Sequence, residues 1–228
     1  MKISEDLKFK KDIIQRISDK EFSERTGVHC SDLLYCLNKQ ALRRLMPLEP
    51  DEHEILLYSL GWSTQRWLTD ERADEPSRTV DGITVTCDEL WQDIPWELKC
   101  TFQSSERPIA DNDSWLKQIM AQCKVIGKTS AHLTRLELAG NWKSIFGRKE
   151  EKNLPENQKP TLHAYLLEFT PEEIEDNWLW LKRRADLFTE LMEGESLLPV
   201  QMALPDPSHR WECDYCRPEY KTLCQDKD

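Results

Sequence analysis

The sequence predicts a single α/β domain in which helices flank a central mixed sheet. Helical periodicity dominates both ends of the chain, and segments rich in β-branched residues lie between them. A further helical segment separates the strand segments into two pairs, an order typical of mixed α/β folds. With 228 residues, the chain is long enough to bury one sizeable core.

Three segments near the start of the chain predict amphipathic helices. The first places Ile13, Ile14 and Ile17 on one face, and Gly27 is expected to end it. Ser31 is the predicted N-cap of the second helix, because a serine hydroxyl accepts a hydrogen bond from an unpaired helical N–H. The expected helices cover residues 4–27, 31–46 and 51–72.

The middle of the chain is rich in β-branched and aromatic residues, which favour strands. Segments 80–88 and 94–102 are separated by a short turn, so we expect them to pair as a hairpin. The remaining expected elements are a helix (111–127), two further strands (131–140 and 162–169) and the exposed polar loop between those strands (141–160).

Segment 170–195 gives the strongest helix signal. Thr170 and Glu173 have the spacing of a capping box, and Pro171 occupies the first helical position. The segment after it, 196–228, has four prolines before its last cysteine and little periodicity. We therefore expect this tail to need a bound metal group to hold it in place.

Composition narrows the possible functions. The chain is 32% charged and 39% hydrophobic with a net charge of −11, so bulk charge does not indicate nucleic-acid binding. The charged start lacks the apolar region of a secretory signal, and no stretch approaches a membrane span. We expect a cytoplasmic protein, in which thiols stay reduced and clustered cysteines indicate metal ligands.

Three cysteines near the end of the chain form a C-x2-C-x7-C pattern. They are Cys213, Cys216 and Cys224. Zinc sites and iron–sulfur clusters usually take four protein ligands, so this set lacks one.

Two carboxylates and a lysine mark the predicted hairpin. Glu97 and Lys99 are two residues apart and share one face of their strand, and Asp88 ends the strand before it. Paired carboxylates bind Mg2+ or Mn2+, and a lysine beside them would orient a metal-bound water or neutralise charge on a phosphorane. An E-x-K triplet alone is also common on ordinary edge strands.

This ordered set resembles the PD-(D/E)XK nuclease superfamily, and within it the RecB-like branch. Gln118 matches the glutamine of that branch's Q-h-x-x-Y helix, and Gln122 stands where tyrosine is usual. Upstream, Gly61 and Gln65 lie in a segment similar to the G-x-x-x-H-x-x-L motif, with Gln65 replacing a histidine ligand. The resemblance implies a restriction-endonuclease-like core. It also leads us to expect that Gln122 affects substrate contacts more than metal binding.

Segment 31–45 resembles the cysteine-bearing segment of the iron–sulfur RecB-like exonucleases. That family includes CRISPR-associated Fe–S exonucleases and the nuclease domain of AddB-type helicase–nucleases. The resemblance implies that a [4Fe–4S] cluster is ligated by one early and three late cysteines, here Cys36, Cys213, Cys216 and Cys224. Such a cluster would tie the C-terminal tail to an N-terminal helix.

Alternatives for this site stay open. Zinc is the second candidate metal, Cys30 competes with Cys36, and His209 is a weaker ligand candidate. Cys87, Cys100 and Cys123 are expected to be buried as small apolar side chains.

The resemblance implies one nuclease domain over residues 1–228. Its expected parts are an N-terminal helical part (1–75), the nuclease core (76–195) and the cluster-binding tail (196–228). The expected activity is metal-dependent exonucleolytic cleavage of single-stranded DNA, in recombination, repair or CRISPR adaptation.

In that interpretation, Asp88, Glu97, the Leu98 carbonyl and Gln65 are the ligands of Mg2+ or Mn2+, and Lys99 and Gln118 assist catalysis. Protein partners in a DNA-processing complex are also expected. The alternative is a non-catalytic module that binds DNA or a protein partner and holds a structural four-cysteine site.

Overall fold

The computed structural model describes residues 5–21, 26–69, 76–101, 108–138, 160–194 and 196–225. The chain forms two compact units, which we describe separately. Unit 1 comprises Met1–Thr26 and Leu48–Ala73, and unit 2 comprises Gly27–Pro47 and Asp74–Asp228.

Unit 1 consists of two helices, α1 (Leu7–Glu21) and α4 (Glu52–Leu68), which pack together. Lys10 on α1 forms an ion pair with Glu52 on α4 at 2.8 Å. Asp51 and Glu54 form a capping box at the start of α4, which satisfies two of its otherwise unpaired N–H groups. No helix in the described part of the chain is long and apolar enough to cross a membrane.

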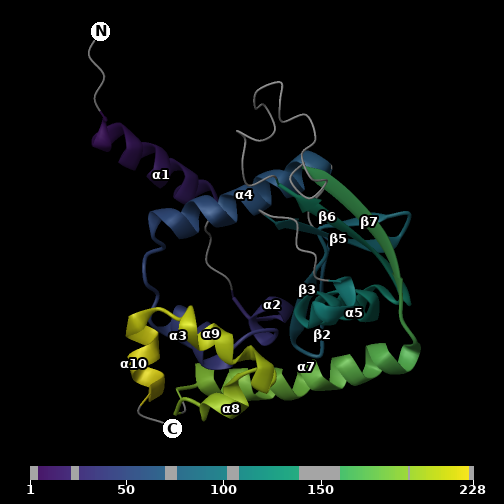
Figure 1. Cartoon of the computed structure of the whole chain (residues 1–228). Helices are drawn as coiled ribbons and strands as arrows, with labels where there is room; N and C mark the ends of the chain where they lie inside the picture. The colour runs from purple at the N-terminus through teal and green to yellow at the C-terminus, as the bar shows by residue number, and fades with distance from the viewer. Residues whose placement is uncertain are drawn as a thin grey trace, which may run out of the picture. The chain divides into compact units, whose positions relative to one another are not determined.

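Unit 2 contains two mixed sheets flanked by helices, where the sequence predicts a single central sheet (Figure 1). The three-stranded sheet has the order β1-β3-β2, and the four-stranded sheet has the order β4-β5-β6-β7. The strands are β1 (Val28–His29), β2 (Ser77–Val80), β3 (Ile83–Thr86), β4 (Glu89–Trp91), β5 (Ile94–Thr101), β6 (Ser130–Glu137) and β7 (Thr161–Glu168).

The predicted hairpin between 80–88 and 94–102 is wrong, because two shorter hairpins replace it. Strands β2 and β3 pair around Asp81-Gly82, and β4 and β5 pair around Gln92-Asp93. All four turn residues have positive φ, between 49° and 79°, as two-residue turns that match the twist of antiparallel strands require. Asp-Gly is a strong hairpin signal in its own right, and it divides the predicted first strand.

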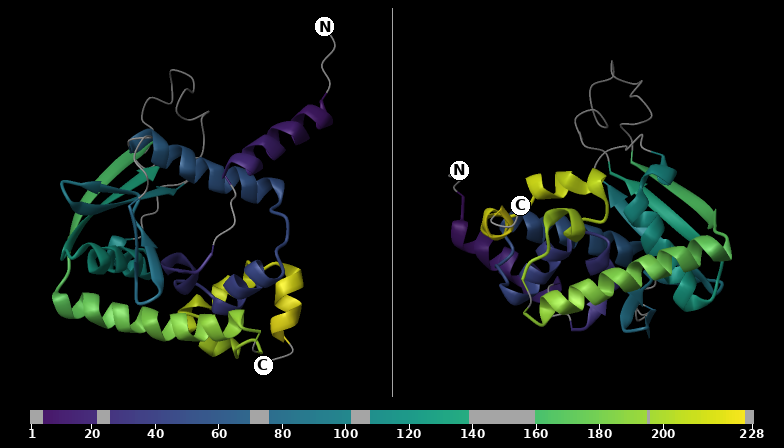
Figure 2. Two further views of the ribbon diagram at one scale, coloured as in Figure 1. Left: turned by 180° about the vertical axis from the view of Figure 1, so that it is seen from behind. Right: turned by 90° about the horizontal axis from the view of Figure 1, so that it is seen from below.

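Helices α5 (Asp113–Ile126) and α7 (Pro171–Met192) lie against each other in unit 2 (Figures 1 and 2). The predicted capping box of α7 is present, with Thr170 and Glu173 bonded to each other's main-chain N–H groups. On α5, Ile119 and Cys123 pack with Leu133 of β6 in a buried cluster. The helix α5 therefore covers the face of the four-stranded sheet that also bears Glu97 and Lys99, since Leu133 is the register partner of Glu97.

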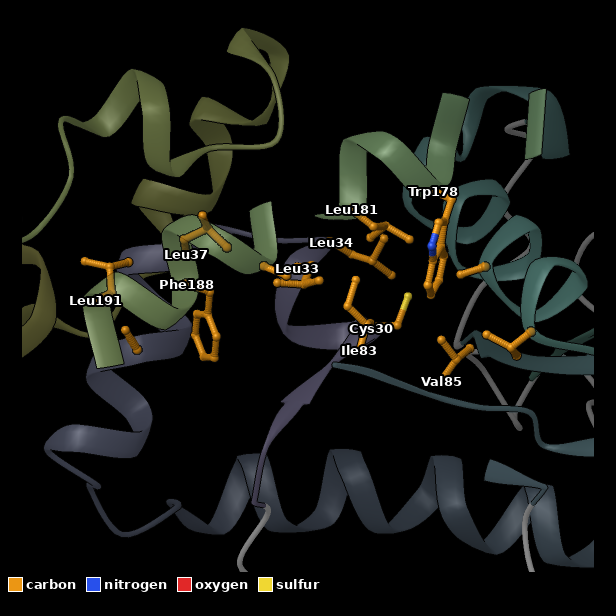
Figure 3. Packing of buried hydrophobic residues seen from close by; sticks show 14 residues of the cluster. Cys30, Leu33, Leu34, Leu37, Ile83, Val85, Trp178, Leu181, Phe188 and Leu191 are labelled. Carbon is orange, nitrogen blue, oxygen red and sulfur yellow. The ribbon is translucent and has the colours of Figure 1, made fainter. Parts of the chain in front are cut away.

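The predicted helix 31–46 is divided into α2 (Cys30–Leu33) and α3 (Leu37–Leu45). His29, and not Ser31, is the N-cap of α2, and Cys36 is the N-cap of α3. The main core lies where α2 and α3 meet α7, with Leu33, Leu37 and Phe188 among its fully buried side chains (Figure 3).

The C-terminal tail is more regular than its sequence indicates. It contains four short elements: α8 (Val200–Ala203), η3 (Pro207–Arg210), α9 (Trp211–Asp214) and α10 (Pro218–Gln225). Another short 3-10 turn, η1 (Ile109–Asp111), precedes α5. Most of the predicted polar loop 141–160 lies outside the described residues.

Candidate active site and cysteine pocket

Strand β5 brings the two predicted carboxylates together. Asp88 lies in the link between β3 and β4, and its Oδ2 accepts a hydrogen bond from the main-chain N–H of Leu98 at 2.6 Å. The strand β4 pairs only with residues 94–96, so in the described structure residues 97–101 have no strand partner on that edge. The N–H and C=O of one strand residue point to the same side, so the Leu98 carbonyl also faces Asp88.

Lys99 lies between a carboxylate and an amide. Its Nζ donates to Glu97 Oε1 at 2.6 Å and to Gln118 Oε1 on α5 at 2.9 Å. Burial favours the neutral amine, but attraction to the Glu97 carboxylate, its hydrogen bond and Asp88 together outweigh burial and raise the pKa of Lys99. Lys99 is therefore an ammonium ion in this site, and it provides positive charge rather than a proton acceptor.

Gln122 contacts the carboxylate site directly. Its side chain is fully buried, and its Nε2 donates to Glu97 Oε2 and, at 3.1 Å, to the main-chain oxygen of Thr86. The family resemblance leads us to expect an effect on substrate contacts more than on metal. Its side chain is buried in this structure, and its bond to Glu97 places it beside the proposed metal ligands.

The oxygens of Asp88 and Glu97 are suitable ligands for a hard divalent cation. Glu97 is 2% exposed, and a carboxylate so deeply buried requires a compensating positive charge, which Lys99 supplies in part. No three His, Cys, Asp or Glu side chains of the described residues converge on a single ion. A cation here would therefore complete its shell with the Leu98 carbonyl, water and substrate, as Mg2+ commonly does. Gln65 lies on α4 in unit 1, and its part in metal binding stays a prediction.

The four predicted cluster cysteines line one pocket in unit 2. Cys36, Cys213, Cys216 and Cys224 surround an empty volume of about 380 Å³, part of which is open solvent. Other lining side chains include Asn38, Lys39, Val200, Glu212 and Lys221. The competing candidates lie elsewhere. Cys30 is in the main hydrophobic core (Figure 3), and His209 pairs with Asp206 at 2.6 Å.

Arg184 holds the pocket's two chain segments together. This α7 side chain is 5% exposed and donates to four main-chain carbonyls: Leu33 at 2.6 Å, Tyr35 at 2.6 Å, Ala203 at 3.0 Å and Leu204 at 3.0 Å. Leu33 and Tyr35 lie just before Cys36 in the sequence, and Ala203 and Leu204 lie at the C-terminal end of α8. Burial lowers the pKa of Arg184 to about 10, which leaves the guanidinium charged at neutral pH.

Two further buried side chains join the same segments. Asn38 donates to the Leu198 carbonyl at 2.7 Å and accepts from the Leu198 N–H at 3.0 Å. Glu212 Oε2 accepts from the N–H of Cys36 at 3.0 Å, across 176 residues of chain. Burial raises the pKa of Glu212, and its Oε1 has no hydrogen-bond partner among the described residues.

At least two of the pocket thiols are protonated at neutral pH. Burial raises the pKa of Cys36 to about 11, and burial likewise raises that of Cys216. Metal binding requires thiolates, so it would release protons here. The Lys39 side chain opposes the pKa shift at Cys216, as its positive charge favours the thiolate.

The sequence prediction missed Arg184, Asn38 and Glu212. Arg184 and Asn38 do carry a signal, because each occupies the buried stripe of its helix. Arg184 lies three residues after Leu181 and four before Phe188, both of which are fully buried. A polar side chain at such a position must find buried partners. Glu212, beside Cys213 in a four-residue helix, has no comparable periodic signal.

No protein-family model matches the chain, and no curated protein matches it in sequence. Among solved structures, the crystal structure of SSO0001 is similar over 91% of this chain and 92% of that chain, with 13% identity and a TM-score of 0.54. A phage-related exonuclease from Haemophilus somnus 129PT matches 75% of this chain and 96% of its own, with 11% identity and a TM-score of 0.46. The first of these shows that the fold has a counterpart among known structures.

Proposed function

We propose that this chain is a metal-dependent DNA nuclease that acts on single-stranded DNA as an exonuclease. The observation that carries the proposal is the convergence of Asp88, Glu97 and Lys99, with Gln118 bonded to the lysine. These are the residues that the PD-(D/E)XK resemblance selects, and they lie together although the predicted hairpin is wrong.

In this proposal Asp88, Glu97 and the Leu98 carbonyl hold Mg2+ or Mn2+. Such an ion supplies Lewis-acid activation of water and neutralises charge on the scissile phosphate. Lys99, an ammonium ion in the metal-free site, would orient the attacking water by donating a hydrogen bond and would stabilise the developing negative charge. Gln118 fixes the position of Lys99 by accepting a hydrogen bond from its ammonium group.

Single-stranded DNA is favoured by an aromatic side chain next to these groups. The ring of Trp115 on α5 lies 6.0 Å from Lys99 Nζ, and a partly exposed ring is a stacking surface for an unpaired base. Recombination, repair or CRISPR adaptation is the biological setting that the family resemblance implies, together with protein partners and a cytoplasmic location.

We propose that the cysteine pocket holds a structural [4Fe–4S] cluster. Four cysteines line it, and Lys39 and Lys221 would offset the negative charge of the cluster and its thiolates. We favour a cluster over zinc because of the ligand pattern. Structural zinc sites more often use two closely spaced ligand pairs, whereas this pocket combines one early cysteine with three late ones.

The nuclease proposal is tested with end-labelled single-stranded oligonucleotides and Mn2+. Asp88→Ala and Lys99→Ala are expected to lower the rate about 100-fold or more, because each removes charge from the reacting centre. Glu168→Ala and Lys182→Ala are matched controls at exposed positions of unit 2 and should retain the wild-type rate. Full activity in both active-site variants would remove the catalytic assignment.

The alternative is a non-catalytic module that binds DNA or a protein. The feature that favours it is Gln65, which stands where the resembling family has a histidine ligand. A wild-type protein that binds single-stranded DNA but cleaves none with Mg2+ or Mn2+ would support this alternative. An inactive Gln65→His variant would strengthen it further.

The cluster proposal is tested by anaerobic purification, absorption spectroscopy and metal analysis. We expect a broad band near about 400 nm and about four irons per chain, as ligation by four cysteines implies. Cys36→Ser should lose most of the iron, whereas Cys30→Ser should retain it. One zinc per chain and no colour would overturn the cluster and leave a four-cysteine zinc site.

A further inference from the structure

We infer that Gln122 is a positioning residue that fixes the spacing between the two carboxylates of the proposed metal site. This inference rests on the proposed function, because it concerns the same carboxylates. The amide nitrogen of Gln122 donates to Glu97 Oε2 and to the Thr86 carbonyl at 3.1 Å. Thr86 ends β3 and precedes Asp88 by two residues. One side chain of α5 thus bonds to both segments that carry the carboxylates.

The orientation of the amide follows from its neighbours. A carboxylate oxygen and a main-chain carbonyl oxygen both accept hydrogen bonds, and only the NH2 end of the amide donates. Rotating the amide by 180° would place its oxygen against two acceptors. The nitrogen must therefore face Glu97 and Thr86, and both of its protons are used.

This arrangement leaves the amide oxygen unsatisfied. Gln122 Oε1 is buried and has no hydrogen-bond partner in the part of the chain that the structure describes. A buried unpaired acceptor is destabilising, so the amide oxygen does not account for a glutamine at this position. The glutamine is explained by what its nitrogen does for the two carboxylate segments.

A tyrosine at this position would not make the same two hydrogen bonds. The family resemblance places tyrosine here, and a phenol has a single O–H donor. The phenol of a Gln122→Tyr variant could donate its proton to Glu97 or to Thr86, but not to both. The pair of donated hydrogen bonds is therefore a property of this chain's own residue.

Mn2+ binding tests the inference independently of catalysis. Gln122→Met keeps the length of the side chain but has no donor, and Gln122→Asn keeps the donors but is too short to reach both partners. We expect either variant to weaken Mn2+ binding about 10-fold or more, as loss of a group that orients a metal ligand does. Free Mn2+ is measured by electron paramagnetic resonance during titration of metal-free protein, and thermal melting confirms that each variant folds.

Cys123→Ala is the matched control. Cys123 is the next residue on α5 and is equally buried, but it packs in the apolar cluster and not against Glu97. It should lower stability without changing the Mn2+ dissociation constant. With single-stranded DNA, the Gln122 variants should lower kcat at a given Mn2+ concentration and leave KM for the DNA unchanged, because Gln122 is too buried to touch substrate.

The outcomes separate this inference from the nuclease proposal. An unchanged Mn2+ dissociation constant in a folded Gln122→Met or Gln122→Asn variant overturns the inference. Asp88-dependent Mn2+ binding that weakens in the Gln122 variants, in a wild-type protein that cleaves no DNA, supports the inference and removes the nuclease proposal. A wild-type protein that binds no Mn2+ overturns both.

Discussion

The carboxylate site and the cysteine pocket are built in opposite ways. Asp88, Glu97 and Lys99 lie within eleven positions of one another, on a short link and one strand, and α5 follows soon after. The pocket instead joins Cys36 to cysteines near the end of the chain, with Glu212 bonded to Cys36 across 176 residues. A local site depends on one strand edge and one helix, whereas the pocket depends on several distant segments meeting correctly.

This difference predicts that the two sites respond differently to mutation. Changes at the carboxylate site should alter metal binding and activity first, because its groups would act on the bound ion and the substrate. Changes around the pocket should lower stability first, because its buried polar groups link elements that lie far apart in the sequence.

The largest effect on stability is expected from Arg184→Leu. It leaves four buried carbonyls without their donor, and each buried unsatisfied group costs about 1–3 kcal/mol before relaxation. We expect a loss of about 3–5 kcal/mol in the free energy of unfolding, measured by urea denaturation. Arg183→Leu, at an exposed neighbouring position, is the control. A loss under about 1 kcal/mol in Arg184→Leu would contradict the expectation that changes around the cysteine pocket lower stability first.

Asn38→Ala should have a smaller effect of the same kind. It removes a reciprocal pair of hydrogen bonds with Leu198, and Asn38 is fully buried. We expect a loss of about 1–3 kcal/mol in urea denaturation. Gln122→Met, at the carboxylate site, should cost less than Asn38→Ala. A larger loss in Gln122→Met than in Asn38→Ala would show that the buried polar contacts of the carboxylate site contribute more to stability than those of the pocket.

Buried cysteines are expected to lower the free energy of unfolding at alkaline pH. Burial raises the pKa of Cys123 to about 12, so the folded state keeps this proton after the unfolded state, with its ordinary pKa near 9.0, has lost it. Stability from this thiol is fully present below about pH 9 and is lost as pH rises toward about 12, by about 1 kcal/mol at about pH 10. Urea denaturation at about pH 8 and about pH 10 should show a smaller difference in Cys123→Ala than in the wild type. An equal loss of stability between the two pH values in both proteins would contradict the raised pKa of Cys123 as its cause.

The smallest effect is expected at the ion pair between Lys124 on α5 and Glu175 on α7. Both side chains are partly exposed, and exposed ion pairs contribute under about 1 kcal/mol. Lys124→Ala should therefore change the midpoint of thermal unfolding by no more than a few degrees, and the change should shrink at high salt. A large, salt-independent loss would show that Lys124 stabilises the contact between α5 and α7 more than its exposure indicates.

The sequence predicts those parts of the molecule whose signals are local. The capping box of Thr170 and Glu173 is confirmed, because two residues three positions apart are enough to form it. The predicted hairpin is wrong because strand propensity does not specify a partner, and the turn residues Asp81-Gly82 decide the pairing. Asp88 lies close to Glu97 despite that error, since the link between two hairpins brings them together as well as one hairpin would.

Long-range partners cannot be predicted in this way. The spacing of Cys213, Cys216 and Cys224 indicates a site, but nothing local in the sequence connects Arg184 to the Leu33 carbonyl 151 positions away. Gln122 illustrates the same limit at short range. Its identity is plain in the sequence, but its bonds to Glu97 and Thr86 follow from how α5 packs on the sheet.

The four bonds of Arg184 also imply an order of events during folding. Its carbonyl partners Ala203 and Leu204 are 19 and 20 positions away, whereas Leu33 and Tyr35 are 151 and 149 positions away. Closing a short loop costs less entropy and happens sooner than closing a long one. We therefore expect the guanidinium to form its hydrogen bonds to Ala203 and Leu204 first. Its bonds to Leu33 and Tyr35, in the segment that links α2 to α3, should form later.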